Sequence, residues 1–342
     1  MPKVSVQIVT WNSARYIGDC LDALQRQTMT DFSVLVIDNG SRDGTVGLVR
    51  SEYPTAAVLE NFKNVGFARG NNQGIKMAKG EYVLVLNPDV VVTSTFLERI
   101  VTFADSQPQA ASFGGKLLKL KSQSINEADG EELQETIQSD IIDSTGLVIK
   151  RSRNVIDRGA GLQDTGQFNR SEEVFGISGA CALYRRSMLN EVVIKNEYFD
   201  EDFFAYKEDV DLAWRLRLYG FLSFYVHDAV AYHHRGFGGG GRSTVRAVLK
   251  SRRLVSRFIR SLSLKNHHLL LCKNEQLVNV FLGLPWIVLQ ELQLFFYTAV
   301  FEPFQFKTTI IFLKQLPRIL IKRRVIMAHA VATARDIRRW LN

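Results

Sequence analysis

The first hundred residues alternate between two hydrophobic periods. Apolar runs typical of buried strands occupy residues 4–10, 33–41 and 81–90. The segments 13–27 and 43–53 instead repeat apolar residues at helical spacing, and a short strand with a Gly-rich loop at 57–70 leads into a helix at 71–80. This order predicts an α/β fold with a mostly parallel, Rossmann-like sheet covered by helices on both faces.

One polar triplet interrupts the last of these apolar runs. Residues 83–92 read VLVLNPDVVV, so Asn87, Pro88 and Asp89 separate two β-branched stretches. All three residue types suit a turn, which is the first interpretation. The second is a strand that carries a carboxylate to the edge of a ligand site. One residue can serve both purposes, so both interpretations stay open.

Polar residues follow three of the predicted strands directly, at 10–12, 38–41 and 87–89. Ligands of such sheets bind at the carboxyl ends of the strands, where the strand order switches. We therefore expect one site at this edge, with Thr10, Asn12, Asp38 and Asn87 among its residues.

The remainder of the chain divides into three parts. Residues 116–174 are more polar and predict strands and loops in an excursion from the core. Order returns from 175 to 234, after which GFGGGGR at 236–242 has the composition of a hinge. Residues beyond 245 predict helices throughout. We expect a catalytic domain at 1–241 and a basic, apolar helical region at 242–342.

Charge separates these two parts. Residues 242–342 hold 18 Lys and Arg against 4 Asp and Glu, whereas the first 241 residues hold 25 against 31. The basic end could bind anionic lipid, nucleic acid or an acidic partner; we expect an anionic membrane surface and no nucleic acid. The N-terminus shows no secretory signal, and the three cysteines are far apart, which favours a reducing cytoplasm.

Residues 277–301 are apolar enough to raise the question of a membrane. Glu291 near the middle disfavours a span, because a carboxylate at the bilayer centre costs about 2.5–3.5 kcal/mol even on a lenient scale. An interfacial or re-entrant helical pair flanked by basic clusters is one interpretation. A helical packing domain with a basic solvated face is the other.

Two loops predict contacts to a nucleotide. A carboxylate after a buried strand, such as Asp38, can accept from the imide N–H of uracil or thymine, although an Asx-turn explains it equally well. The loop 64–75 meets a helix start, where backbone N–H groups face phosphate. Its candidate residues are Asn64, Gly66, Arg69 and Asn71. A helix cap is the alternative there, and no G-x-G-x-x-G follows the first strand.

Asp89 and one of two adjacent histidines are candidate metal contacts. A hard divalent cation prefers oxygen ligands and keeps substrate phosphates in its shell, so one strand-end Asp with two phosphate oxygens meets its needs. Neighbouring residues of a strand point to opposite faces, so at most one of His233 and His234 faces the site.

The densest signal is acidic. Six acids occur between Asp200 and Asp211, and EDVDLAWRLRLYG predicts a helix whose first turn carries Glu208, Asp209 and Asp211. The helix dipole alone favours acids there. A carboxylate in an aromatic-walled pocket is also a plausible general base. Arg215, one turn later, could pair with Asp211 and leave Asp209 freer.

Together these segments resemble the family-2 inverting glycosyltransferases of GT-A fold, particularly their rhamnosyltransferase-like branch. The resemblance rests on VSVQIVTWN, DNGSRDGT, NVGFARGNNQGI, LNPDV, SGACALYRR, FDEDFFAYKEDVDLAWR and the His233 region, in the family's order over about residues 4–240. It implies a nucleotide-sugar donor with Asp38 at the base, Asp89 in the D-x-D metal position, and His233 as a further metal contact. Asn87 departs from the stricter motif, which has Asp there.

The resemblance also implies Asp209 as catalytic base, Glu208 and Asp211 as acceptor-side or secondary acids, and Mg²⁺ or Mn²⁺ as cofactor. The expected function is transfer of a sugar from a dTDP-rhamnose-like or UDP-sugar donor to a glycan or lipid-linked acceptor in cell-surface polysaccharide assembly. We expect it at the cytoplasmic face of the membrane, peripherally bound. The rivals are a nucleotidyltransferase, for which no basic Gly-rich signature follows the first strand, and a non-catalytic nucleotide-sugar-binding module.

Overall fold

A computed structural model describes residues 1–126, 132–234 and 255–342. Its strands are β1 (Val4–Thr10), β2 (Phe32–Asp38), β3 (Ala57–Glu60), β4 (Tyr82–Leu86), β5 (Val90–Val92), β6 (Ala110–Asn126), β7 (Glu132–Ser144), β8 (Leu147–Ile149), β9 (Val155–Asp157), β10 (Glu172–Glu173), β11 (Cys181–Arg185) and β12 (Leu222–His233). Its helices are α1 (Ala14–Gln25), α2 (Thr45–Glu52), α3 (Phe67–Met77), α4 (Phe96–Asp105), α5 (Arg186–Glu191), α6 (Glu208–Leu218), α8 (Arg257–Asn274), α9 (Leu277–Phe301), α10 (Phe306–His329) and α11 (Ala334–Arg338).

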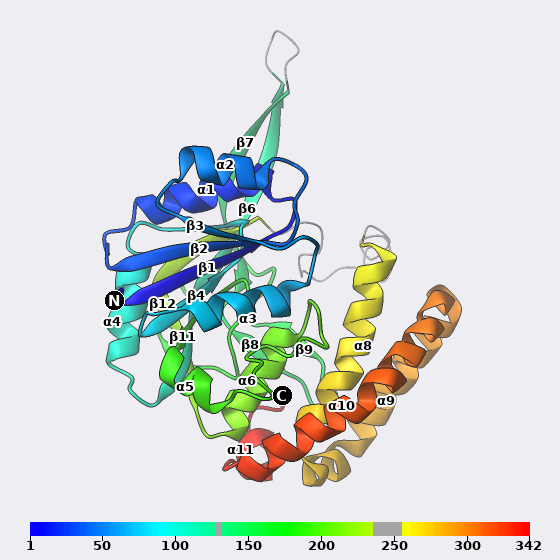
Figure 1. Cartoon of the computed structure of the whole chain (residues 1–342). Helices are drawn as coiled ribbons and strands as arrows, with labels where there is room; N and C mark the ends of the chain where they lie inside the picture. The colour runs from blue at the N-terminus through cyan, green and yellow to red at the C-terminus, as the bar shows by residue number, and fades with distance from the viewer. Residues whose placement is uncertain (127–131, 235–254) are drawn as a thin grey trace.

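One sheet organises the first two thirds of the chain. Its order is β10-β12-β6-β11-β4-β1-β2-β3, and the four strands from β4 to β3 are parallel. Beyond β4 the sheet is mixed, because β11 runs antiparallel to both β4 and β6. Helices α1 and α2 lie on one side of the sheet and α3 on the other (Figure 1). The predicted α/β fold is confirmed.

The strand order switches at β1. The chain adds β2 and β3 on one side of β1 and then places β4 on the other, which is the topology that opens a crevice at the carboxyl ends of the strands. The apolar run of β4 is fully buried because both faces of the sheet are covered. This arrangement brings the end of β1 and the triplet after β4 to the same edge.

Residues 116–174 differ from the expected excursion. Strands β6 and β7 form a long antiparallel hairpin that projects beyond the sheet (Figure 1). The base of the hairpin belongs to the core, however, because Leu117 and Ile142 are buried, and so is Ile149 of the following strand, β8. The glycine-rich stretch at 236–242 and the expected domain boundary lie outside the described residues.

The C-terminal helices stand against the lower part of the sheet domain (Figure 1). Residues 277–301 form a single helix, α9, and a short 3₁₀ turn at Pro303–Gln305 connects it to α10. Helix α9 is long and apolar enough to cross a membrane, by length and composition only. Helices α8 and α10 pack on α6 through an apolar cluster that includes Trp214, Leu270 and Ile326.

Candidate active site

Two neighbouring cavities lie at the carboxyl edge of the sheet. The first, of about 650 Å³, is lined by Phe67, Asn87, Asp89, Ser178, Gly179, Ala180, Ala205, Tyr206, Lys207, Glu208, Asp209, His233, Val255 and Ile259. The second, of about 590 Å³, is lined by Val9, Thr10, Trp11, Asn39, Asn64, Gly66, Phe67, Phe204, Ala205, Tyr206, Ser256, Phe258, Ile259 and Leu262. Because Phe67, Ala205, Tyr206 and Ile259 line both, the cavities share a wall.

Asp209 lies at the start of α6 and faces the first cavity. One carboxylate oxygen accepts from the Gly179 amide at 2.8 Å and the other from the Val210 amide at 2.8 Å. Burial raises the pKa of Asp209 above the ordinary aspartate value, although these amides oppose the shift. No described cation forms a salt bridge with this carboxylate, so it is held in place yet able to accept a proton.

Glu208 lies beside it with a different environment. Its side chain is buried, and its Oε2 has no hydrogen-bond partner. Burial, and then the charge of Asp209, raises the pKa of Glu208 well above the ordinary glutamate value. Two carboxyl groups of adjacent residues, both with raised pKa values, therefore line this cavity.

Asp211 is placed elsewhere. It is fully buried and does not line the cavity. Arg215 donates to it at 3.1 Å, as its position one turn later predicted. Lys273 and Asn274 of α8 also donate to it, both at 2.8 Å. Both oxygens of Asp211 are therefore bound by protein donors away from the cavity, and its expected role as an acceptor-side acid stays a prediction.

Asp89 and His233 meet in the first cavity from two different elements. The turn at 87–90 is real, since Val90 N donates to Asn87 O, and it also delivers Asp89 to the cavity. His233, at the end of β12, brings Nε2 to 3.4 Å from Asp89 Oδ1. His234 instead lies 5.3 Å from the Tyr16 ring, so one histidine of the pair faces the site.

Asp143 of β7 fixes the ring of His233. Its Oδ2 lies 2.9 Å from Nδ1 of the histidine, and the aspartate is buried. Burial opposes the charged imidazole, but hydrogen bonds with Asp143 and then Asp89 outweigh it and raise the pKa of His233 to about 9. A carboxylate on Nδ1 is the arrangement that orients metal-binding histidines, and a cation at Nε2 would have to displace the proton that this nitrogen shares with Asp89.

The donor set fits a divalent cation that takes further ligands from a substrate. The distance between Asp89 Oδ1 and His233 Nε2 is close to that between two neighbouring ligands of one cation. The buried Oδ1 of Asn87, on the wall of the same cavity, has no hydrogen-bond partner. The described residues hold no cluster of three or more His, Cys, Asp or Glu side chains that could bind a metal alone. Such a partial set is usual for Mg²⁺, which keeps substrate phosphates and waters.

The expected nucleotide contacts are only partly brought together. Thr10, Asn64 and Gly66 line the second cavity. Gly66 has a φ of +89°, and a Cβ there would meet Phe204 at 2.6 Å, so only glycine fits. Asn39, which the sequence interpretation passed over, is buried and lines the same wall.

Asp38 and Asn12 have their polar atoms occupied. Thr10 and Ser41 donate to the Asp38 carboxylate, and the Ser41 amide does so at 2.8 Å, which is the Asx-turn alternative. Asn12 accepts from the Arg42 amide at 2.9 Å. Neither residue lines either of these two cavities; they tie the loop after β1 to the loop after β2.

Arg69 and Asn71 lie outside both cavities as well. The Arg69 side chain is 59% exposed and sits 3.8 Å from Glu201. Asn71 is fully buried and accepts from Gln7 at 2.7 Å. The predicted helix at 71–80 starts earlier, at Phe67, so Asn71 falls inside α3 rather than in a loop. The Ala68 amide at the helix start donates to Phe204 O.

A clamp from the C-terminal helices holds the loop 200–207 that leads to Asp209. Lys273 donates to Asp200 at 2.6 Å and Lys322 donates to the same carboxylate. Asn266 Nδ2 donates to the carbonyls of Ala205 and Tyr206. The loop includes positive φ values at Phe204, Tyr206 and Lys207, which are strained for residues with a Cβ.

Comparisons with known proteins agree with this architecture. The model of the family described as Glycosyl transferase family 2 matches residues 5–193, and that of Glycosyl transferase family group 2 matches 147–325. A Mycobacterium tuberculosis N-acetylglucosaminyl-diphospho-decaprenol L-rhamnosyltransferase is 31% identical over 69% of this chain and 77% of its own. A Campylobacter jejuni GalNAc(5)-diNAcBac-PP-undecaprenol beta-1,3-glucosyltransferase is 25% identical over 67% of this chain and 63% of its own.

Two solved structures share the fold at low identity. A mannosyltransferase from Pyrobaculum calidifontis in complex with GDP-Man and Mn²⁺ superposes with a TM-score of 0.50 and 16% identity, over 96% of this chain and 87% of its own. GalNAc-T7 with UDP, GalNAc and Mn²⁺ gives a TM-score of 0.56 and 13% identity, over 79% and 48% respectively.

Proposed function

The chain belongs to glycosyl transferase family 2, and on that premise we propose that it transfers a sugar, with inversion, from a dTDP-rhamnose-like or UDP-sugar donor to a hydroxyl of a glycan or lipid-linked acceptor in cell-surface polysaccharide assembly. One observation carries the proposal: a single cavity holds Asp89, His233 and Asp209 at the switch point of the sheet. Residues 1–241 form the catalytic domain of this proposal and 242–342 its membrane-facing helical region.

Asp209 is the general base. An acceptor hydroxyl attacks the anomeric carbon, its proton passes to the Asp209 carboxylate, and the bond from that carbon to the diphosphate oxygen breaks. One displacement inverts the centre. The two amide hydrogen bonds fix the direction in which the carboxylate faces, and its raised pKa strengthens it as a base near neutral pH.

Asp89 and His233 would hold a divalent cation, Mg²⁺ or Mn²⁺, with Asn87 beside them. When bound, the ion supplies positive charge that stabilises the departing diphosphate. The partner-less Asn87 Oδ1 and the Asp143–His233 pair support this assignment. Lys207 lines the same cavity; burial lowers the pKa of its ammonium group and the charge of Asp209 opposes that shift, and its charged form would add to the stabilisation of the diphosphate.

The nucleotide occupies the second cavity, against Thr10, Asn64 and Gly66. Aromatic side chains on its walls, Trp11 and Phe258 among them, suit a base and a ribose better than they suit a phosphate. Asp38 and Asn12 act there by shaping the loops, and Asp38 reaches the base only if the Asx-turn opens.

The acceptor is lipid-linked, and the protein acts peripherally at the cytoplasmic face of the membrane. The names of the two curated relatives above specify polyprenyl-diphosphate-linked substrates. An exposed apolar helix beside a strongly basic region supports the same location for this chain. The proposal includes no nucleic-acid partner.

The test is calorimetric titration of UDP and dTDP into the full chain, with and without Mn²⁺. We expect one nucleotide to bind in a metal-enhanced way and Asp89→Ala to remove the enhancement. Asp228→Ala is the matched control, because Asp228 is a surface carboxylate paired with Arg99. Binding of neither nucleotide by folded protein would overturn the proposal, and metal enhancement that survives Asp89→Ala would remove Asp89 from the metal site.

A further inference from the structure

Helix α9 exposes apolar side chains along its whole length. They recur at helical spacing and are roughly half exposed or more: Leu277, Phe281, Leu284, Val288, Leu292 and Phe295. Helix α10 continues the surface with Phe306, Ile310 and Leu313. We call these nine residues the apolar face. Contiguous apolar surfaces of this extent mark interaction sites, since water-facing helices of monomers rarely carry them.

Other side chains of α9 bind it to the rest of the protein through polar groups. Glu291 accepts from His267 at 3.1 Å and from His268 at 2.9 Å, both on α8. Asn279 is buried and donates to the Ala334 carbonyl. These contacts hold α9 on the molecule, and we expect the helix to lie along a membrane surface and not to cross it.

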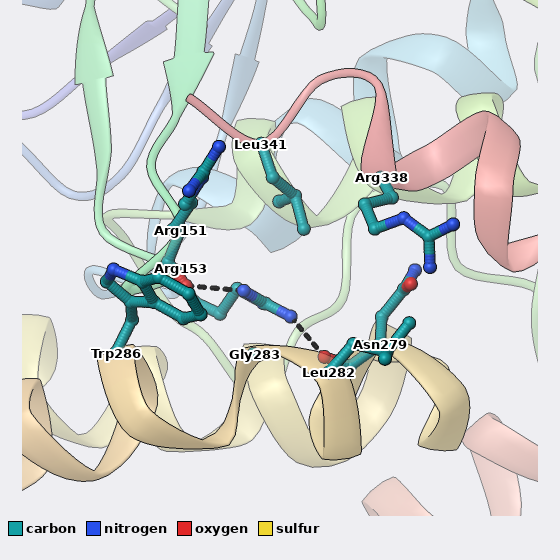
Figure 2. Close-up of a pocket in the computed structure, with 8 residues that line it drawn as sticks. All are labelled: Arg151, Arg153, Asn279, Leu282, Gly283, Trp286, Arg338 and Leu341. Carbon is teal, nitrogen blue, oxygen red and sulfur yellow. Dashed lines mark hydrogen bonds between the residues drawn. The ribbon is translucent and has the colours of Figure 1, made fainter.

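A cavity of about 350 Å³ opens beside this helix, between α9, the loop after β8 and the C-terminus (Figure 2). Arg151, Trp286 and Arg338 line it, and the Arg151 guanidinium lies 5.4 Å from the Trp286 ring centre. Neither Arg151 nor Arg338 has a carboxylate partner among the described residues. Two unneutralised guanidinium groups therefore share one cavity.

The floor of the cavity is built and rigid. Arg153 is buried, pairs with Glu275 and donates to the carbonyls of Arg151 and Asn279 (Figure 2). Gly283 leaves room for this guanidinium, because a Cβ there would meet it at 2.6 Å. The buried Oδ1 of Asn279, also on the cavity wall, has no partner and can accept from a ligand hydroxyl.

We propose that this cavity binds the phosphoglycerol headgroup of an anionic phospholipid whose acyl chains lie against the exposed side chains of Leu282 and Trp286 at its rim, with α9 and α10 at the membrane surface. Guanidinium groups recognise phosphate through paired hydrogen bonds, and Asn279 offers an acceptor for a glycerol hydroxyl. Tryptophan beside the headgroup is the usual anchor at a membrane surface. The proposal rests on the membrane location given under Proposed function and adds the site and the lipid class.

Charge decides between a lipid and a second copy of the chain. Helix α10, which carries part of the apolar face, also carries the exposed cations Lys307, Lys314 and Arg324, so two copies meeting through this face would bring like charges together. An anionic lipid surface is complementary to the same region.

The experiment is flotation of the full chain with vesicles of phosphatidylcholine alone and of equal parts phosphatidylcholine and phosphatidylglycerol. The variant is Arg151→Ala/Arg338→Ala. The control is Arg324→Ala/Arg335→Ala, which removes two exposed arginines of the same region that do not line the cavity. We expect the cavity variant to lose about tenfold or more of its affinity for the anionic vesicles and the control to lose about threefold or less.

Three outcomes separate the claims. Equal losses in both variants overturn the headgroup site and leave general electrostatic binding. No binding of the unaltered chain to anionic vesicles overturns the membrane location as well. Calorimetric titration of inorganic phosphate and of short-chain phosphatidylglycerol decides the source, since phosphate binding as tightly as the lipid overturns the lipid assignment. Metal-enhanced nucleotide binding must survive in the cavity variant, which shows that it is folded and keeps this experiment distinct from the test of transfer.

Discussion

The sheet domain and the C-terminal helices handle charge and apolar surface in opposite ways. In the sheet domain, apolar strands such as β4 are buried, and the carboxylate of Asp209 faces a cavity. In the C-terminal region, α9 leaves its apolar residues exposed, whereas Lys273 and Lys322 are buried. The buried cations of the second region neutralise Asp200 and Asp211 of the first. The C-terminal helices therefore stabilise the loop 200–207 of the candidate site through their buried lysines. Their exposed apolar residues remain available to a partner.

Asp209 and Asp211 are two residues apart on α6 and give the sharpest contrast. We expect Asp209→Asn to lower transfer about 10²–10⁴-fold, because a general base contributes that much. Nucleotide affinity should stay near that of the unaltered chain. The unfolding free energy should fall by about 1 kcal/mol, since one of the two backbone amides that donate to this side chain keeps an oxygen partner and the other loses it. Steady-state transfer kinetics and urea unfolding measure both effects.

Asp211→Asn is the matched comparison for that variant. It removes a charge that Arg215, Lys273 and Asn274 contact, so stability should fall far more than with Asp209→Asn. If Asp209→Asn lost nucleotide binding in parallel with turnover, Asp209 would belong to the donor site and not to proton transfer.

Lys273→Met tests the contact between the C-terminal helices and the sheet domain. The variant leaves Asp200 and Asp211 short of a cation in a buried setting, and breaking such a pair costs about 3–5 kcal/mol. Arg318→Ala, which removes an ion pair whose arginine is 61% exposed, should cost about 1 kcal/mol or less. Urea unfolding compares the two. Equal, small losses would mean that the helices do not stabilise the loop.

The pH dependence of transfer should distinguish Asp209 from an ordinary surface aspartate. Burial raises its pKa, so the base is protonated, and activity lost, as pH falls through a midpoint above the ordinary value of 3.8. Below that midpoint the rate falls about tenfold per pH unit. A profile of kcat/KM from acid to neutral pH measures the limb. A midpoint at or below 3.8 would contradict the burial of this carboxylate in the working enzyme.

Local patterns in the sequence predicted what depends on neighbours along the chain. The alternation of strands and helices in the first hundred residues can be predicted from the sequence, because the apolar residues recur there with the period of the element that buries them. The Asp211–Arg215 pair is one helical turn long, so its spacing predicted it. The sequence also predicts the turn at Asn87–Asp89 and the two roles open to it, a simple turn and a turn that carries a carboxylate to a ligand site.

What the sequence did not reveal depends on distant partners. Asp143 orients His233 from 90 residues away, and Lys273 reaches Asp211 across 62. No local pattern distinguishes a lysine that will be buried from one that stays in water. Asn71 was misplaced for the same reason: its partner, Gln7, lies on β1, and only the packing of α3 on the sheet brings them together.

The smallest expected effect concerns the apolar face itself. Phe281 is 74% exposed, so Phe281→Ser should change the unfolding free energy by about 0.5 kcal/mol or less. Leu84→Ala, at a fully buried position of β4, should cost about 2–5 kcal/mol. The Phe281→Ser variant should nevertheless lose vesicle binding, because the apolar side chain that is exposed to water in the free protein would be buried at a lipid surface. Chemical unfolding and flotation on the same samples compare the two quantities. A Phe281→Ser protein that loses stability as Leu84→Ala does would show that the face is covered by protein in solution, and one that keeps both stability and vesicle binding would remove Phe281 from the membrane contact.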